Sequence, residues 1–372
     1  MVDTQRAGGQ TVALLVAGYQ PTDAIEDQER GVHPWRDEIL LERAVDAQVL
    51  DFTIADEALA NSKVLRKLND LGVGRIWILG FLAARASRDF RAVYATGEDI
   101  AIPYSIFSSL FRRTTKLVMR VEDIERGRST ARRALFRLLF RRAVRRSDAI
   151  LCRTTAHVDA LSPISGSRGH VRLVAESVDG EFFSPENASG SLPENITLRD
   201  RPLIVSAGLE HRDYPTLLDA IDGLDVDVVI GAGSPWSTDR FDPGRSEPPA
   251  NVHVDRFGHC EMRDLFSRAD LVVVPVRATT RACGITVVLE ASAMERPVVC
   301  TGTDGLATYV EDNVSALTAP PGDAKALRGA IERALGDQAL CGQLAAQARE
   351  NVRTRFDQRF FIDAVAEELT ND

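Results

Sequence analysis

The sequence predicts an α/β protein with two Rossmann-like domains, each built on a parallel sheet. The chain has 372 residues, more than a single hydrophobic core normally reaches. Short apolar runs alternate with segments whose apolar residues recur every three or four positions, the pattern of strands alternating with helices. Residues 183–201 contain prolines and glycines but few large apolar side chains, which is typical of a linker. We therefore expect domains at 1–182 and 202–354.

Each domain is expected to hold six strands separated by helices. The first set lies at 11–18, 49–53, 92–97, 116–121, 149–154 and 171–176. The second set lies at 202–208, 226–233, 251–255, 270–276, 296–302 and 315–321. Helical periodicity is clearest at 38–48, 56–70, 130–146, 214–222, 262–267, 285–294, 323–335 and 357–369.

Composition excludes several classes of protein. The net charge of −9 argues against a dedicated nucleic-acid binder, because such proteins collect positive charge to replace phosphate counterions. The five cysteines are scattered without CxxC spacing, so neither a disulfide framework nor a zinc site is expected. No apolar run approaches the roughly 18 residues of a spanning helix, and the N-terminus has no signal-peptide core. We expect a cytoplasmic protein.

One segment departs from the acidic average. Between Arg132 and Arg146, seven arginines alternate with apolar residues at helical spacing. One interpretation is an outer helix whose arginine stems cover apolar side chains while the charged ends reach water. The other is peripheral docking on anionic lipid, since each basic residue near such a surface contributes about 1 kcal/mol.

The stretch from Ala282 to Thr301 has the features of a phosphate site. A strand ending at Pro275 leads through a glycine turn into a helix, whose first-turn N–H groups have no partner inside the helix and attract anions. The predicted donors are the backbone N–H groups of four consecutive residues. These are Cys283, Gly284, Ile285 and Thr286. The alternative is an ordinary strand-to-helix turn.

Further segments extend this pattern in a fixed order: SAGLEHRDYPTLLDAI (206–221), VVIGAG (228–233), ADLVVVP (269–275), LEASAMERPVV (289–299) and LTAPPGDAKALRGAI (317–331). Together they resemble the family-4 glycosyltransferases (glycosyl transferases group 1), which have the GT-B fold. The resemblance implies two Rossmann-like domains facing each other across a cleft, with a C-terminal helix, 355–372, completing the first. It also implies a nucleotide-diphosphate-sugar donor, retention of configuration and no metal or other cofactor.

The resemblance assigns two side chains of the donor site. Glu290 matches the glutamate that binds the ribose hydroxyls, although a helix-start carboxylate that favours the dipole would have the same sequence. Arg212, shortly after Gly208, matches a lysine that neutralises the diphosphate. Ala282 stands where relatives commonly carry a second glutamate facing the sugar, and Leu209 replaces an arginine. The donor sugar is therefore not readable from the motif.

The remaining site residues come from loops at the carboxyl ends of strands. Base recognition is expected from Gly233, Ser234, Phe257 and His259. On the acceptor side, His33 lies in a long loop, and Glu98 and Asp99 follow a strand.

Glu122 and Asp123 stand where relatives often have a histidine. They are candidates to accept a proton or to bind acceptor hydroxyls, or else to cap a helix or pair with Arg120 or Arg126. No metal site is expected.

These features favour a retaining, metal-independent glycosyltransferase that moves a sugar to a hydroxyl of a glycan, a lipid or a small molecule. Two alternatives remain: a catalytically inactive GT-B protein that binds a nucleotide or glycan as a partner, and a related epimerase. Ala282, Leu209 and the missing histidine favour the inactive protein.

Overall fold

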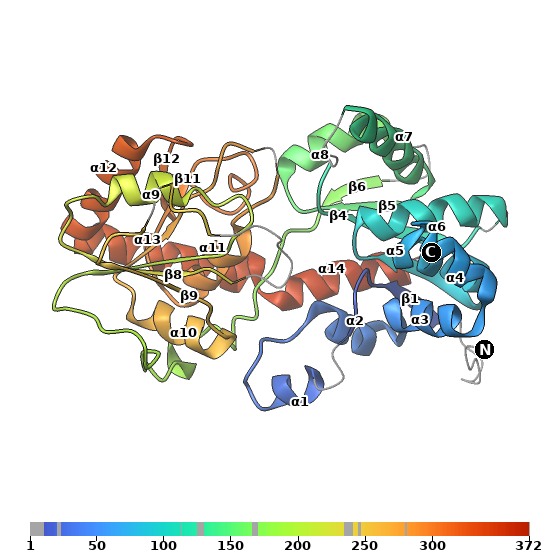
Figure 1. Ribbon diagram of the computed structural model, residues 1–372, viewed down its shortest axis with the longest axis horizontal. Coiled ribbons are helices and arrows are strands. Elements are labelled where there is room, and N and C mark those ends of the chain that lie inside the picture. Colours follow the sequence, from blue (N-terminus) through green and yellow to red (C-terminus); the bar gives the residue numbers. More distant parts are fainter. Residues whose placement is uncertain are drawn as a thin grey trace. The chain divides into compact units, whose positions relative to one another are not determined.

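The computed structural model describes residues 11–20, 24–112, 114–124, 130–165, 170–233, 241–244, 247–279 and 281–371. The chain folds as two compact units (Figure 1). The first unit comprises Met1–Ile25, Arg36–Val174 and Ile362–Asp372, and the second comprises Glu26–Trp35 and Ala175–Phe361.

The first unit contains a six-stranded parallel sheet in the order β2-β1-β3-β4-β5-β6. The strands are β1 (Thr11–Leu15), β2 (Ala47–Leu50), β3 (Phe90–Ala95), β4 (Lys116–Val121), β5 (Ala149–Cys152) and β6 (His170–Leu173). The residues of β1, β3, β4 and β5 are almost all buried, as expected for a parallel sheet covered by helices, whereas the central residues of the two edge strands, β2 and β6, are partly exposed. Every strand predicted for this domain is present.

The helices of this half are α1 (Ala24–Glu29), α2 (Asp37–Val45), α3 (Phe52–Asn61), α4 (Lys63–Asp70), α5 (Gly74–Ala86), α6 (Glu98–Leu110), α7 (Thr130–Arg146) and α8 (Thr155–Leu161). The helix expected over 56–70 is in fact two helices. They separate at Ser62, which has extended backbone angles and caps α4 by accepting a hydrogen bond from the Leu65 N–H at 3.3 Å. The helix expected over 130–146 is confirmed as α7.

The second unit contains another six-stranded parallel sheet, in the order β12-β11-β10-β7-β8-β9. Its strands are β7 (Leu203–Ala207), β8 (Asp227–Gly231), β9 (Val252–Asp255), β10 (Leu271–Val274), β11 (Val298–Thr301) and β12 (Leu317–Ala319). Its helices are α9 (Tyr214–Ala220), α10 (His259–Arg268), α11 (Ile285–Ala293), α12 (Ala324–Gly336) and α13 (Gln338–Asn351). The strand order reverses beside β7, which lies between β8 and β10.

The segment expected to be a linker, 183–201, packs against the second unit. Ser189 donates from its N–H and its hydroxyl to the Asp264 carboxylate, at 2.7 and 2.6 Å. Ile196 is buried in the same apolar core as β7 and α11. The proline and glycine content thus indicates an irregular backbone, and hydrogen bonds and apolar packing fix this segment on the second unit.

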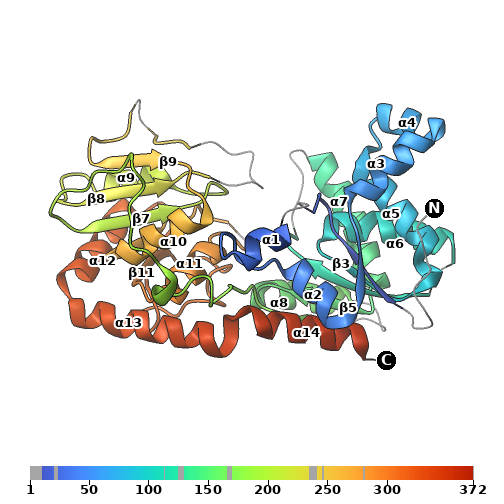
Figure 2. The ribbon, with the colours of Figure 1, turned by 90° about the horizontal axis from the view of Figure 1, so that it is seen from below.

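The last helix, α14 (Gln358–Thr370), confirms the helix expected over 357–369 (Figure 2). Its residues from Ile362 onward belong to the first unit, where Glu368 contacts His170 at 2.9 Å. Lys116 donates to the carbonyl of Asn371 at 2.5 Å. Within the described part of the chain, no helix combines the length and the apolarity needed to cross a membrane.

Candidate functional site

The strand reversal in the second sheet brings two loops together at its carboxyl edge. The N–H of Asp213, after β7, donates to the carbonyl of Pro275, after β10, at 3.0 Å. In the same way Arg277 donates to His211 at 2.9 Å, and Arg212 pairs with Val276 as an antiparallel bridge. Ligands of parallel α/β sheets bind at such reversal points. The residues predicted for the diphosphate lie on these two loops.

Arg212 is held tightly at this edge. Arg212 is only 7% exposed. Its Nε donates to the carbonyl of Ala207 at 2.8 Å, and its Nη1 donates to the carbonyl of Glu210 at 3.0 Å. Gly208 lies directly beneath the guanidinium: its φ is +90°, and a Cβ there would stand 2.5 Å from Arg212 Nη2. The glycine therefore serves both the turn and the close approach of the cation.

The charge of Arg212 is not balanced by an ion pair with any residue in the described ranges. Burial lowers the pKa of Arg212, while Tyr214, Cys283, Glu210 and Glu290 oppose that shift. An arginine remains protonated under these conditions. A buried cation without a carboxylate is costly, so this position favours an anionic ligand.

The N-terminus of α11 forms the other half of the predicted diphosphate site. Gly284 is its N-cap with φ of +89°, and a Cβ there would lie 3.1 Å from both Val274 and Val276. The predicted set of four N–H donors needs a correction, because the Cys283 N–H donates to the carbonyl of Arg281 at 2.9 Å. The N–H groups of Gly284, Ile285 and Thr286 remain, with Thr286 exposed.

Glu290 lies on the same helix, partly buried among apolar neighbours. Burial raises the pKa of Glu290 to about 8, and the charge of Arg212 lowers it less strongly. Burial thus favours the neutral form of this carboxyl group in the free protein. Arg212 lies close enough to act on it electrostatically.

Arg281, which was not predicted from the sequence, also lies at this site. Its Nη1 lies 2.9 Å from Nε2 of His211 and 3.2 Å from Oε1 of Glu210, so it links the two loops. Its position just before the glycine turn, in the sequence RACG, is the signal that would have identified it. It adds a second, partly exposed cation to the carboxyl edge.

The residues predicted to bind the base follow the two outer strands, β8 and β9, of the same sheet edge. Gly233 faces Arg256, and Phe257 packs against Gly231. His259 opens α10, and desolvation together with the charge of His33 lowers its pKa. Ser234 lies outside the described residues. The other three residues thus share an edge with the predicted diphosphate site.

His33, predicted on the acceptor side, belongs to the second unit rather than to the one that holds Glu98 and Asp99. Its ring lies edge-on to that of His259, with centroids 4.9 Å apart. The segment is anchored at Trp35, whose N–H donates to Asp179 at 2.8 Å. The structure thus places His33 beside a residue predicted to bind the base.

The other acceptor-side residues lie at the carboxyl edge of the first sheet. Glu98 is completely buried, and its Oε2 accepts hydrogen bonds from the backbone N–H groups of Glu122 at 2.8 Å and Asp123 at 3.4 Å. Asp99 Oδ1 accepts from the Ile100 N–H at 2.9 Å at the start of α6. Glu98 therefore fixes the turn that carries the two predicted catalytic carboxylates.

Glu122 and Asp123 differ in their surroundings. The Glu122 carboxylate pairs with Arg120 Nε at 3.3 Å and with Arg153 Nη1. Of the two arginine partners considered for this pair, Arg126 lies outside the described residues. Asp123 is 3% exposed.

His157, on α8, was not predicted. It is completely buried, and desolvation and the charge of Arg153 lower its pKa while Asp123 raises it.

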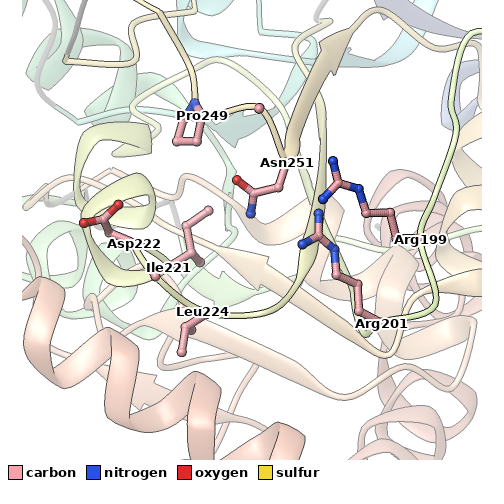
Figure 3. Close-up of a pocket in the computed structure, with 9 residues that line it drawn as sticks. Arg199, Arg201, Ile221, Asp222, Leu224, Pro249 and Asn251 are labelled. Carbon is pink, nitrogen blue, oxygen red and sulfur yellow. The ribbon is translucent and has the colours of Figure 1, made fainter.

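A cavity of about 260 Å³ lies at the opposite, amino edge of the second sheet. Figure 3 shows Arg199 and Arg201 on one side of it and Ile221 and Asp222 on the other. Arg201 is already paired with Asp225 at 3.2 Å and with Asp227. These carboxylates neutralise Arg201, which distinguishes it from Arg212.

Comparison with known proteins agrees with this geometry. Residues 211–337 match the family model described as Glycosyl transferases group 1. The lipopolysaccharide core biosynthesis glycosyltransferase LpsE of Rhizobium meliloti (strain 1021) is 23% identical over 231 residues, 61% of this chain and 65% of LpsE. The alpha-D-kanosaminyltransferase of Streptomyces kanamyceticus is 26% identical over 220 residues, 56% of each chain. The alignments thus span between about half and two thirds of these relatives.

Two solved structures are similar over nearly their whole length. Anabaena HepE in complex with UDP and glucose superposes with a TM-score of 0.70 at 17% identity, covering 98% of this chain and 100% of HepE. Sucrose-phosphate synthase from Thermosynechococcus elongatus gives a TM-score of 0.67 at 15% identity, covering 97% and 98%. The protein therefore has the GT-B fold of two Rossmann-like units, as predicted. The segment that matches the family model, residues 211–337, lies within its second unit.

Proposed function

We propose that this protein is a glycosyltransferase that moves a sugar from a nucleotide-diphosphate donor to a hydroxyl group. The observation that carries the proposal is the buried, unbalanced guanidinium of Arg212 at the strand reversal of the second sheet. A diphosphate supplies the missing negative charge, and an arginine presents its N–H groups to phosphate oxygens in a fixed plane. HepE, which has the same fold, is described in complex with UDP and with UDP-glucose, which supports this donor class.

The proposed chemistry uses charge stabilisation of the leaving group. Arg212 and the N–H groups at the start of α11 stabilise the departing diphosphate, a task that a metal ion performs in other enzymes. Glu290 binds the ribose hydroxyls. A phosphate oxygen of the leaving group takes the proton of the acceptor hydroxyl on the same face of the sugar, so the configuration is retained and no metal is required.

For the acceptor we propose a role for the carboxyl edge of the first sheet. We assign the contact with the acceptor hydroxyl to Glu122 and Asp123, of which Glu122 also pairs with two arginines. Glu98 holds the turn on which both carboxylates stand. The acceptor is a hydroxyl-bearing glycan, lipid or small molecule.

A contact with anionic membrane through α7 is the second part of the proposal, and it implies a location at the inner, cytoplasmic face of a membrane. Leu135 and Leu138 are 57% and 67% exposed on this helix. Arg141, Arg142 and Arg145 lie one to two turns away, also exposed, and pair with no carboxylate in the described ranges. Apolar side chains flanked by cations are typical of helices that lie in the membrane interface.

Nucleotide sugars provide the test of the transferase proposal. Incubation with UDP-, GDP-, ADP- and CDP-sugars should raise the melting temperature with one nucleotide class, since a ligand at 100 times its Kd adds about 2.7 kcal/mol to the free energy of unfolding. The stabilising donor should slowly release free nucleotide. Arg212→Lys keeps a charge but loses the planar fork, so the rate of nucleotide release should fall and the Kd should rise at least about tenfold. A tenfold higher Kd reduces the stabilisation by about 1.4 kcal/mol at the same donor concentration. Arg353→Lys, at an exposed ion pair, should behave as wild type. Absence of stabilisation by all four donors would refute the proposal, and binding without nucleotide release would indicate the inactive partner.

Vesicle flotation tests the contribution of α7. The triple variant Arg141→Gln, Arg142→Gln, Arg145→Gln should float with vesicles containing phosphatidylglycerol at least about tenfold less than wild type, because each cation contributes about 1 kcal/mol near such a surface. Neither protein should float with neutral phosphatidylcholine vesicles. Equal flotation of both proteins with the anionic vesicles would contradict the role of α7.

A further inference from the structure

Helix α4 and its C-cap carry a stripe of exposed apolar side chains. Val64, Leu68 and Leu71 are 69%, 40% and 74% exposed. Their spacing of four and three residues places them on one side of the helix and its C-cap. No residue of α4 is buried. We call these three residues the α4 stripe.

The helix itself is well defined despite this exposure. Ser62 caps its N-terminus, and Leu65, on another side of the helix, packs against the core of the first unit. Figure 2 shows α4 at the periphery of the first unit. The α4 stripe therefore faces outward because of the orientation that Leu65 fixes, and contiguous exposed apolar surface of this kind marks an interaction site.

The charges beside the stripe indicate what covers it. Lys63, Arg66 and Lys67 are exposed and form no ion pair with the described residues, and Asp70 is the single acidic residue of the helix. This local excess of positive charge occurs in a chain whose net charge is −9. Apolar side chains bordered by unpaired cations are complementary to a surface with an apolar interior and anionic groups at its edge.

A second feature favours a flat, extended partner over a groove in another protein. Helix α4 contacts α5, α5 contacts α6, and α6 contacts α7, so both helices with exposed leucines and cations belong to one helical layer of the first unit. A bilayer surface can accommodate both of them at once. A protein groove would engage one helix face.

We propose that α4 is a membrane anchor that inserts the α4 stripe between the headgroups of anionic lipids, with Lys63 and Lys67 binding lipid phosphates. At about 1.5 Å per residue, a helix of this length lies in the interface and does not span the bilayer. The proposal extends the membrane contact proposed for α7. Because it assigns a separate set of residues, the experiments distinguish the two helices from each other and from the donor site.

Flotation of the full chain with phosphatidylcholine vesicles that contain phosphatidylglycerol tests the anchor. Val64→Gln, Leu68→Gln, Leu71→Gln together should reduce the bound fraction at least about tenfold, since each of these side chains loses its favourable transfer out of water. Lys63→Gln with Lys67→Gln should reduce binding and make it less sensitive to salt. Val314→Gln, at an apolar residue of the second unit that is 42% exposed, is the matched control and should bind as wild type.

A local readout and two contrary outcomes complete the test. Leu71→Trp should show a blue-shifted emission on addition of anionic vesicles, with no shift when neutral vesicles are used. The α4 variants should retain the thermal stabilisation by nucleotide sugar, which shows that they fold and separates this proposal from the transferase proposal. Wild-type flotation by the triple glutamine variant would overturn the anchor. So would a dimer of the wild-type protein in light scattering that the triple variant abolishes, because the stripe would then bind a second copy.

Discussion

Gly208→Ala is expected to raise the Kd for the nucleotide sugar at least about tenfold, whereas a glycine variant that loses similar stability elsewhere should keep the wild-type Kd. A Cβ at this position would lie 2.5 Å from Nη2 and 3.0 Å from Cζ of Arg212. The guanidinium would have to move, which breaks its bonds to the carbonyls of Ala207 and Glu210. Hydrogen bonds to a charged group contribute about 1.5–3 kcal/mol each, so loss of one phosphate contact accounts for the expected change in Kd.

Gly223→Ala is the matched control for this substitution. Gly223 also has a positive φ, +72°, but a Cβ there would meet no atom within 4 Å. Both variants therefore lose about 1–2 kcal/mol of stability through backbone strain, and only Gly208→Ala should raise the Kd. Isothermal titration with the stabilising nucleotide sugar measures the difference. Equal affinities in the two variants would show that Arg212 does not bind the donor.

The motifs of the second unit were predictable because they are local. Gly284 follows a buried strand and precedes a helix, so its positive φ and the free N–H groups of α11 follow from consecutive residues. The position of Arg212 follows from the same rule, applied to β7. The hydrogen bond from the Cys283 N–H to the carbonyl of Arg281 depends on the path of one loop, so it could not be inferred from residue types.

The surroundings of the residues predicted on the acceptor side were less predictable, because their contacts join distant parts of the chain. The sequence shows that Glu98 follows a strand, but not that it is buried beneath a turn 24 residues later. His33 lies in a segment that packs on the second unit, so its nearest aromatic partner, His259, is far away in sequence. The exposure of the α4 stripe likewise depends on the packing of Leu65 against the core, which orients the helix. The spacing of apolar residues in the sequence does not show which side of the helix faces the core.

The second large effect is expected for Glu290→Gln, which should raise the stability of the free protein at pH 8 and weaken the binding of the nucleotide sugar. Burial raises the pKa of Glu290 to about 8, above the value near 4.5 that applies in an unfolded chain. Between these two values the folded protein binds more protons than the unfolded one, so the free energy of unfolding falls as the pH rises. Each unit of difference corresponds to about 1.4 kcal/mol, and because the side chain is partly exposed we expect a loss of one to a few kcal/mol.

Glu290→Gln replaces the carboxyl with a neutral group of the same shape and should remove this pH-dependent loss. Chemical denaturation at pH 5 and pH 8 should show a smaller difference between the two pH values for the variant than for wild type, with the variant more stable at pH 8. Glu332→Gln, an exposed glutamate paired with Arg328, should keep the wild-type difference. If Glu290→Gln keeps the full difference as well, the loss arises from another group.

The same substitution should weaken donor binding, because a carboxylate accepts hydrogen bonds from both ribose hydroxyls and an amide presents only one accepting oxygen. We expect a Kd about tenfold higher for the nucleotide sugar in Glu290→Gln. The affinity for the corresponding nucleotide that lacks both ribose hydroxyls should be unchanged. These two results together would show that Glu290 lowers the stability of the free protein and serves ribose binding, a trade-off expected of binding sites. Equal loss of affinity for both nucleotides would instead indicate that Glu290 acts through the shape of α11.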